Sequence, residues 1–281
     1  MDPTPLVSTA WLADNAARAD VVIFDTTKYL PNEGKDGLVE FRRGHIQGAR
    51  FFDIDHIADA ETDLPHMVPT PGRFAHLVAA LGVGNGSFVV FYDQKGLASA
   101  ARGWWMMGLF GHDRAAVLDG GLPKWVADGH ALEVGDPRPQ AAPAAFRADF
   151  RATRLRGIGD MLANVASQRE LVLDARAGNR FRAEAPEPRA GMRSGHIPGS
   201  ANLPYTELLA ADQTLLPKDA LRARLAAAGV DAHRPVVTSC GSGVTACIVT
   251  LALTVAGLPA GAVYDGSWTE WGGRPDTPII S

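Results

Sequence analysis

The chain has 281 residues, of which 46% are hydrophobic and 21% charged, a composition typical of a globular protein with two domains or one large one. Its formal net charge of -4 and pI near 6.1 provide no basic excess, which argues against nucleic acid or an anionic membrane as a partner. The longest apolar run, from Ala246 to Gly257, is far shorter than a membrane span.

The cellular compartment is predicted from the N-terminus and the cysteines. Residues 1–7 contain neither the basic region nor the apolar core of a secretory signal. The only two cysteines, Cys240 and Cys247, lie too close together in the chain to cross-link a large secreted fold. We therefore expect a soluble cytoplasmic protein.

The first half of the chain reads as alternating helices and strands. Ser8 or Thr9 is expected to cap a short helix, and a second helix is expected over 71–81, ending before Gly82. A third helix is expected through 104–110. Short runs rich in β-branched and aromatic residues predict buried strands at 21–25, 88–93 and 115–119.

The second half repeats this order. It contains predicted strands at 171–174, 236–240 and 262–266 and a helix that ends at Gly229. Five pairs of landmarks are separated by 146 to 151 residues: Asp25 and Asp174, Gly44 and Gly195, Gly82 and Gly229, Asp93 and Cys240, Asp119 and Asp265. This near-constant spacing predicts a duplicated domain of normal size.

Strands that alternate with helices in each copy predict an α/β fold in which a mostly parallel sheet has helices on both faces. The segment from Glu133 to Ala152 is rich in Pro and Ala without an apolar period, which is typical of a linker. We place the N-terminal domain at 1–135, the linker at 136–153 and the C-terminal domain at 154–281.

The most informative stretch is residues 236–246, which reads as a strand, a tight loop and the start of a helix. The strand ends at Cys240, and two glycines follow. Such a loop points backbone N–H groups inward at the positive end of a helix, where it can hold an anion and activate a thiol. Cys240 is therefore a candidate nucleophile, whereas Cys247 fits the commoner role of a buried helix residue.

The sequence Cys-Gly-Ser-Gly-Val-Thr-Ala at 240–246 resembles the active-site loop of the 3-mercaptopyruvate sulfurtransferases of the rhodanese superfamily. Thiosulfate-using rhodaneses typically carry Arg-Lys where this chain has Gly241-Ser242. The resemblance covers nearly the whole chain and also includes Gly44-His45-Ile46, Trp104-Trp105, Asp119-Gly120-Gly121, Arg180-Phe181-Arg182, Pro186-Glu187-Pro188-Arg189, Gly195-His196-Ile197-Pro198-Gly199 and Tyr264-Asp265-Gly266-Ser267-Trp268.

The resemblance implies two tandem rhodanese-like α/β domains and an enzyme that needs no metal or organic cofactor. Its Cys240 thiolate would take sulfur from 3-mercaptopyruvate, release pyruvate, and pass the sulfur from a persulfide to thioredoxin, a small thiol or cyanide. Ser242, Thr245 and the loop N–H groups would stabilise the thiolate and developing charge. The backbone of Gly241, Gly243 and Val244 would contribute to substrate binding.

The repeat distinguishes residues of the scaffold from residues of the chemistry. His45 and His196 both occur in Gly-His-Ile, so we expect turn histidines bonded to backbone, and a role for His45 near the catalytic loop stays open. Asp119 and Asp265 are likewise expected in turns. The first copy has Asp93 in place of Cys240, which predicts one active site per chain.

Four arginines occur only in the second copy. The resemblance places Arg180 and Arg189 at positions that grip the carboxylate and keto oxygen of the substrate, a task suited to a planar bidentate donor. We expect Arg176 and Arg182 to be solvated surface residues. Before Pro186 this chain has Arg-Ala-Glu-Ala at 182–185, where relatives more often have Gly-Thr-Glu.

Three other functions are alternatives to a 3-mercaptopyruvate sulfurtransferase. A cysteine phosphatase or arsenate reductase needs an arginine at the sixth position after its cysteine, which here is Ala246, and a phosphoryl dianion would be held poorly. A thiosulfate sulfurtransferase and a persulfide relay that receives its sulfur from a partner protein both remain alternatives. The paired arginines argue against the relay, because a relay needs no carboxylate pocket.

Overall fold

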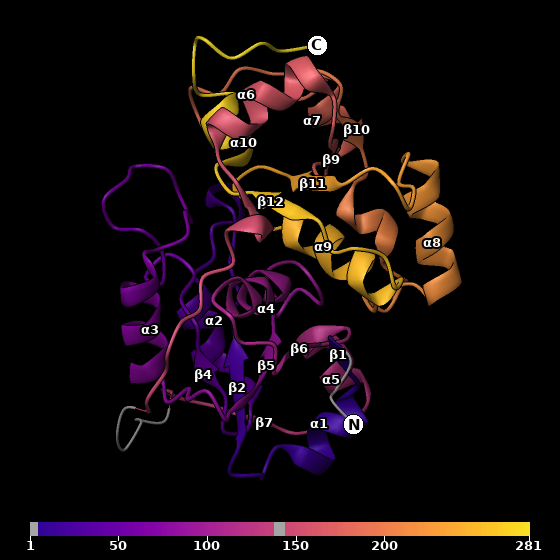
Figure 1. Ribbon diagram of the computed structural model, residues 1–281. Coiled ribbons are helices and arrows are strands. Elements are labelled where there is room, and N and C mark those ends of the chain that lie inside the picture. Colours follow the sequence, from indigo (N-terminus) through magenta and orange to yellow (C-terminus); the bar gives the residue numbers. More distant parts are fainter. Residues whose placement is uncertain (1–4, 138–143) are drawn as a thin grey trace. The chain divides into compact units, whose positions relative to one another are not determined.

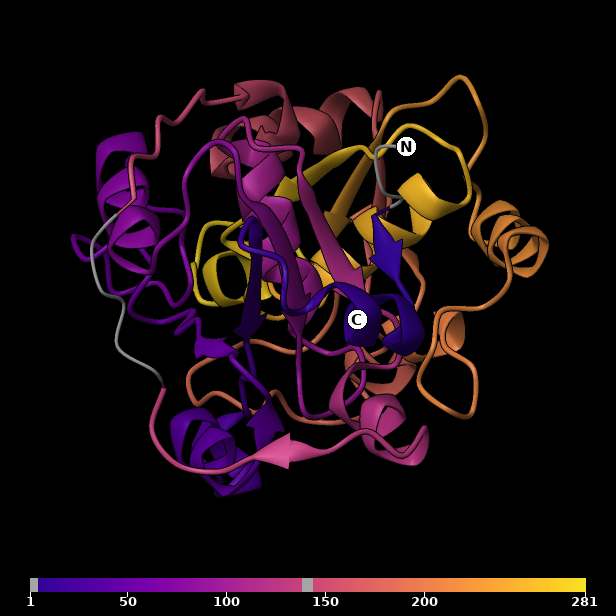
Figure 2. The same cartoon turned by 90° about the horizontal axis from the view of Figure 1, so that it is seen from below.

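The computed structural model describes residues 5–137 and 144–281. The chain divides into two compact units, each described by itself below. The first unit comprises Met1–Ala60, Val68–Arg151 and Ala211–Thr214, and the second comprises Glu61–Met67, Ala152–Ala210 and Leu215–Ser281 (Figures 1 and 2). Part of the predicted linker, residues 138–143, lies outside the described residues, and the domain boundaries given above remain a prediction.

A five-stranded parallel sheet forms the centre of the first unit. Its strands, in order, are β1 (Leu6–Val7), β6 (Ala115–Leu118), β5 (Phe88–Tyr92), β2 (Val21–Asp25) and β4 (Arg50–Phe51). All five residues of β5 are buried, as expected for a strand in the middle of a sheet with both faces covered. The three strands predicted in this half are confirmed.

Helices flank this sheet (Figure 1). They are α1 (Thr9–Asn15), α2 (Gly37–Arg43), α3 (Pro71–Ala80), α4 (Ala100–Leu109) and α5 (Gly121–Ala127), with a 3-10 turn η1 (Pro31–Glu33). Ser8 caps α1 by accepting a hydrogen bond from the Trp11 N–H, as predicted. Outside the sheet, β3 (His45–Ile46) pairs antiparallel with β7 (Leu132–Glu133).

The second unit repeats this architecture. Its parallel sheet has the order β8 (Leu155–Arg156), β12 (Ala262–Tyr264), β11 (Val236–Ser239), β9 (Leu171–Asp174) and β10 (Ala201–Asn202). Its helices are α6 (Ile158–Ser167), α7 (Gly178–Phe181), α8 (Lys218–Ala227), α9 (Ala246–Val255) and α10 (Ser267–Trp271), with 3-10 turns η2 (Ala152–Arg154) and η3 (Tyr205–Leu208). The two sheets have the same strand order, so the predicted duplication is confirmed.

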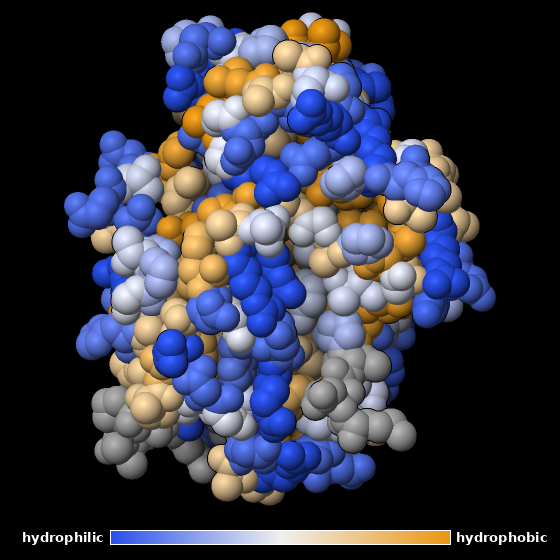
Figure 3. All heavy atoms as spheres, in the orientation of Figure 1, coloured by the Kyte–Doolittle hydropathy of each residue, from blue (hydrophilic) through white to orange (hydrophobic). Residues whose placement is uncertain are grey.

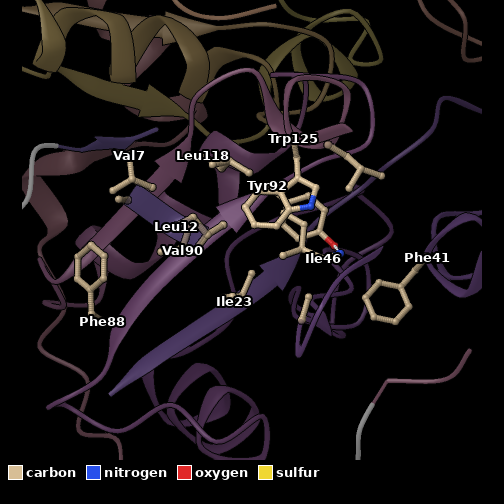
Figure 4. Packing of buried hydrophobic residues seen from close by; sticks show 13 residues of the cluster. Val7, Leu12, Ile23, Phe41, Ile46, Phe88, Val90, Tyr92, Leu118 and Trp125 are labelled. Atoms are coloured by element: carbon tan, nitrogen blue, oxygen red, sulfur yellow. Dashed lines mark hydrogen bonds between the residues drawn. The ribbon is translucent and has the colours of Figure 1, made fainter. Parts of the chain in front are cut away.

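Each unit has its own apolar core. In the first, residues from strands and helices pack together around Tyr92 and Trp125, and the Tyr92 hydroxyl accepts the Ile46 N–H at 3.1 Å (Figure 4). In the second, Tyr264, Trp268 and Trp271 are almost fully buried. Burial of each such side chain stabilises the fold by about 1.5 to 3 kcal/mol.

The outer surface contrasts with these cores. On the face drawn in Figure 3, hydrophilic residues are interspersed with hydrophobic ones. Over residues 5–137 and 144–281, no helix combines the length and the apolar character that crossing a membrane requires.

The repeated Gly-His-Ile segments are built alike. Nδ1 of His45 lies 3.0 Å from the carbonyl oxygen of Phe41, and Nδ1 of His196 lies 3.0 Å from that of Phe181. Each imidazole also stacks on the ring of the phenylalanine whose carbonyl it contacts, with 3.9 Å between ring centres. The predicted backbone-bonded histidines are confirmed, and Asp119 and Asp265 lie in a turn and a bend after their strands, also as predicted.

The two segments differ in length. His45 follows its phenylalanine by four residues and His196 by fifteen. The second copy therefore has eleven more residues between this phenylalanine and its histidine. Glu187 and Arg189 lie in this insertion.

Asp25, at the end of β2, generates a prediction about stability. Its carboxylate accepts hydrogen bonds from the Thr27 N–H at 2.8 Å and from Nε2 of Gln94 at 3.1 Å, but burial still raises its pKa to about 6. Because the folded state then binds a proton more tightly than the unfolded chain, this group's contribution to stability increases as the pH falls through 6. We expect acidification from about pH 7.5 to 5.5 to raise the free energy of unfolding of wild type by roughly 1 kcal/mol more than that of Asp25→Asn.

Urea denaturation of both proteins at the two pH values measures this difference. Equal pH dependence of wild type and Asp25→Asn would contradict the assignment to Asp25.

Candidate active site

Cys240 lies at the carboxyl edge of the second sheet. It directly follows β11, the central strand, and its neighbours β9 and β12 end beside it because all three strands are parallel. Loops at the carboxyl ends of parallel strands are where α/β proteins bind their ligands. Cys240 is a free cysteine that is 2% exposed.

The backbone of Cys240 is held in place by the start of α10. The Cys240 N–H donates to the Ser267 hydroxyl at 3.1 Å, and that hydroxyl donates to the Tyr264 carbonyl at 2.8 Å. The N–H groups of Trp268 and Thr269 donate to the carbonyls of Cys240 and Gly241 at 3.0 and 2.8 Å. The sequence motif that contains Ser267 does not predict this role for the serine.

The loop between β11 and α9 turns sharply. Gly243 has φ of 74°, a left-handed conformation that glycine adopts at little cost, whereas Gly241 does not have a positive φ. Ser242 and Val244 are buried, Gly241 and Thr245 are partly exposed, and α9 begins at Ala246. The predicted strand, loop and helix are therefore confirmed.

The matching loop of the first unit shows what this turn can bind. Asp93 stands where the second copy has Cys240. One oxygen of its carboxylate accepts the N–H groups of Ala98, Ser99 and Ala100 at 2.8 to 2.9 Å, and the other accepts that of Lys95 at 2.9 Å. The turn thus forms a cradle for an anion, and in the first unit the chain's own carboxylate fills it.

Arg180 lies over the loop of the second unit. Its Nη2 atom is 3.4 Å from the position that a Cβ atom on Gly241 would occupy. Its Nε donates to Glu187 at 3.2 Å, and Nη2 donates to the other oxygen of the same carboxylate. The structure therefore brings Arg180 next to the cysteine loop.

Arg189 has a different neighbour. Its Nη2 lies 3.3 Å from Nε2 of His66, a buried residue of the 61–67 segment of the second unit. Sequence reasoning missed both His66 and Glu187. Glu187 could have been found from its place between two prolines in the Arg-containing insertion, but His66 is far from the other site residues in the chain and has no such signal.

The expectation that Arg176 is a solvated surface residue is wrong. Its side chain is 0% exposed and donates to Asp174, to Glu187 at 2.9 Å and to the Gly195 carbonyl at 2.8 Å. The guanidinium also stacks over Trp268, 4.1 Å from the ring centre. Two carboxylates and an aromatic face compensate the loss of water, which permits the burial.

Arg182 is a surface residue, as predicted. Its side chain is 58% exposed and pairs with Glu184. The next residue, Ala183, has φ of 59°, a left-handed conformation that favours glycine. A left-handed alanine costs about 1 to 2 kcal/mol, so this segment is more strained here than it would be with glycine.

Comparison with known proteins agrees with this geometry. The model of the rhodanese-like domain matches residues 8–128 and 158–274, and the chain belongs to the rhodanese family. The 3-mercaptopyruvate sulfurtransferase of Homo sapiens is 42% identical over 272 residues, covering 95% of this chain and 91% of the relative.

Two further similarities extend over most of the chain. Thiosulfate/3-mercaptopyruvate sulfurtransferase 1, mitochondrial, of Arabidopsis thaliana is 40% identical over 296 residues, covering 99% of this chain and 78% of the relative. The crystal structure of the 3-mercaptopyruvate sulfotransferase SseA from Escherichia coli superposes with a TM-score of 0.85 at 37% identity, covering 95% of this chain and 99% of that one. The chain is therefore a sulfurtransferase with two tandem rhodanese-like domains.

The two cysteines provide a direct test of the nucleophile. Cys247 is fully buried in α9 and donates to the Gly243 carbonyl at 3.3 Å, a bond that a serine hydroxyl can replace. We expect Cys240→Ser to abolish sulfur transfer from any donor and Cys247→Ser to keep most of it, because only Cys240 lies at the mouth of the loop. The measurement is the mass of the protein after treatment with donor, where a gain of one sulfur atom should require Cys240.

If folded Cys247→Ser were as inactive as Cys240→Ser, a mechanism with two cysteines would replace this one.

Proposed function

We propose that this protein is a 3-mercaptopyruvate sulfurtransferase. The Cys240 thiolate attacks the sulfur of the donor, the carbon–sulfur bond breaks, and its electron pair leaves with the carbon as the enolate of pyruvate, which then takes up a proton. Cys240 keeps the sulfur as a persulfide and passes it to a thiol of a thioredoxin-like protein, to a small thiol or to cyanide. The observation that carries the proposal is a free cysteine in a loop that has no charged residue and that matches the carboxylate-binding turn of the first unit, with Arg180 beside it.

The first unit supports the persulfide intermediate. The charged oxygen of an aspartate lies two bonds from its Cβ atom. The charged outer sulfur of a cysteine persulfide also lies two bonds from Cβ, so the two charged atoms occupy similar positions. Three N–H groups surround that oxygen of Asp93. The same turn around Cys240 would stabilise the outer sulfur in the same way, at no cost in reorganisation.

The substrate's remaining groups are assigned to the arginines and the loop. Arg180 and Arg189 bind the carboxylate and keto oxygen through charge-assisted hydrogen bonds. Ser242 and Thr245 hydroxyls, with the N–H groups of Gly241, Gly243 and Val244, stabilise the thiolate and the charge that develops on the donor. Both cysteines are free thiols, which is consistent with a cytoplasmic location in a reducing environment.

Thiosulfate is the second candidate donor, because the name of the Arabidopsis relative includes both compounds. Thiosulfate is a compact dianion that leaves as sulfite, so fixed cations in the loop would favour it. At about 4 Å a unit charge near a surface contributes roughly 4 kcal/mol at an effective dielectric constant of 20. Residues 240–246 include no such cation.

The arginines provide the second test of this function. We expect Arg180→Ala and Arg189→Ala each to lower kcat/KM for 3-mercaptopyruvate by the equivalent of about 2 to 4 kcal/mol, the loss expected when a charged donor to a substrate oxyanion is removed. Arg182→Ala is the matched control, because that arginine is exposed and pairs with Glu184. Equal losses in all three variants would show that the arginines act only as a diffuse positive field.

Donor choice provides the third test. Steady-state kinetics with a common acceptor should show a preference for 3-mercaptopyruvate over thiosulfate of at least about tenfold in kcat/KM, or about 1.4 kcal/mol. Replacing Gly241-Ser242 by Arg-Lys should move the ratio toward thiosulfate. A Cβ atom at 241 fits at ordinary contact distance from Arg180. An unchanged ratio in the exchanged loop would show that loop charge does not select the donor.

A further inference from the structure

Four side chains of alternating charge form an ion-pair network beside the cysteine loop, residues 240–246. Asp174 pairs with Arg176, Arg176 with Glu187, and Glu187 with Arg180. The exposed fractions of these side chains are 2% for Asp174, 0% for Arg176, 4% for Glu187 and 21% for Arg180. Among the four, only Arg180 reaches solvent to a substantial extent, and it does so over Gly241.

This ion-pair network is connected to the cysteine loop through Trp268. Arg176 stacks on the Trp268 ring, and the backbone N–H of Trp268 donates to the Cys240 carbonyl at 3.0 Å. The first unit lacks this ion-pair network among its described residues. There the carboxylate of Asp25, which matches Asp174, accepts from Thr27 and Gln94 and has no arginine partner among the described hydrogen bonds and ion pairs. The arrangement is therefore a property of the copy that carries the cysteine.

The geometry determines which part of Arg180 can meet a ligand. Glu187 accepts from Nε and from Nη2, so it occupies one edge of the guanidinium, and the edge formed by Nη1 and Nη2 remains for a second carboxylate. The formal charges of the four side chains sum to zero. Arg180 can therefore donate hydrogen bonds to a ligand from Nη1 and Nη2, while the carboxylate of Glu187 neutralises its positive charge.

We propose that Glu187 is a specificity-determining residue that fixes the guanidinium of Arg180 and neutralises it, so that the site favours a monoanionic thiol acid over a dianionic sulfur donor. Glu187 acts through Arg180, and is a positioning residue. This inference rests on the proposed function, because it concerns the donor that Arg180 binds.

Two physical effects of removing the Glu187 charge act in the same direction on donor choice. An uncompensated positive charge attracts a dianion about twice as strongly as a monoanion at the same distance. A guanidinium that is no longer held can lose its bidentate alignment with a planar carboxylate, which harms the thiol acid more than a compact tetrahedral anion. Both effects move the ratio of rates toward thiosulfate.

The experiment compares wild type with Glu187→Gln, Glu187→Asp and Glu184→Gln. Each folded protein is mixed with excess 3-mercaptopyruvate or thiosulfate without acceptor, and the rate at which Cys240 gains one sulfur atom is followed by intact-protein mass. Glu184→Gln is the matched control, since Glu184 lies three residues away and pairs only at the surface with Arg182.

We expect Glu187→Gln to shift the ratio of the two loading rate constants at least about tenfold toward thiosulfate, and Glu184→Gln to leave it within about twofold of wild type. Glu187→Asp keeps the charge beside Arg176 but is one methylene too short to hold Arg180. It should shift the ratio in the same direction by a smaller factor of about three, and it provides the test if Glu187→Gln does not fold.

An unchanged ratio in a folded Glu187 variant, with wild type loaded by 3-mercaptopyruvate, would overturn this assignment and leave the proposed function intact. Failure of 3-mercaptopyruvate to load the wild-type enzyme would overturn the proposed function and this inference with it.

Discussion

The catalytic unit depends on one buried guanidinium. Arg176 contacts the end of β9 through Asp174, the insertion through Glu187, the Gly-His-Ile segment through the Gly195 carbonyl, and the ring of Trp268. Three of these partners lie within 19 residues of Arg176 in the chain, whereas Trp268 is far from it, and a single side chain contacts all four segments. Removing one partner of such a buried pair typically costs about 3 to 5 kcal/mol, because the remaining charge is left without compensation.

The two copies show how one scaffold serves two purposes. Their sheets have the same strand order, and in both a turn follows the carboxyl end of the central strand. In the first unit the cradle is filled by Asp93, which stabilises its own loop. In the second unit Cys240, which has no carboxylate, stands at the matching position. The duplication thus produces one turn that binds its own carboxylate and one turn that carries a thiol.

Electrostatic compensation is a common theme of the site. The loop has no fixed cation, and the arginine beside it is paired with a buried carboxylate. Under the proposed function, such a site selects ligands by shape and hydrogen-bond direction more than by net charge, which suits a planar keto acid with a single negative charge.

The sequence alone determined the local elements. The β-rich runs of β2, β5 and β11, the duplication and the glycine-containing loop after Cys240 were predictable because hydrophobic period and glycine conformation act between near neighbours. Only the tertiary structure decided that Arg176 is buried, that Glu187 bridges two arginines, that Ser267 accepts the Cys240 N–H, and that His66 lies against Arg189. An arginine can be solvated or buried according to partners that other segments supply, and no local pattern records which carboxylate the fold will bring to it.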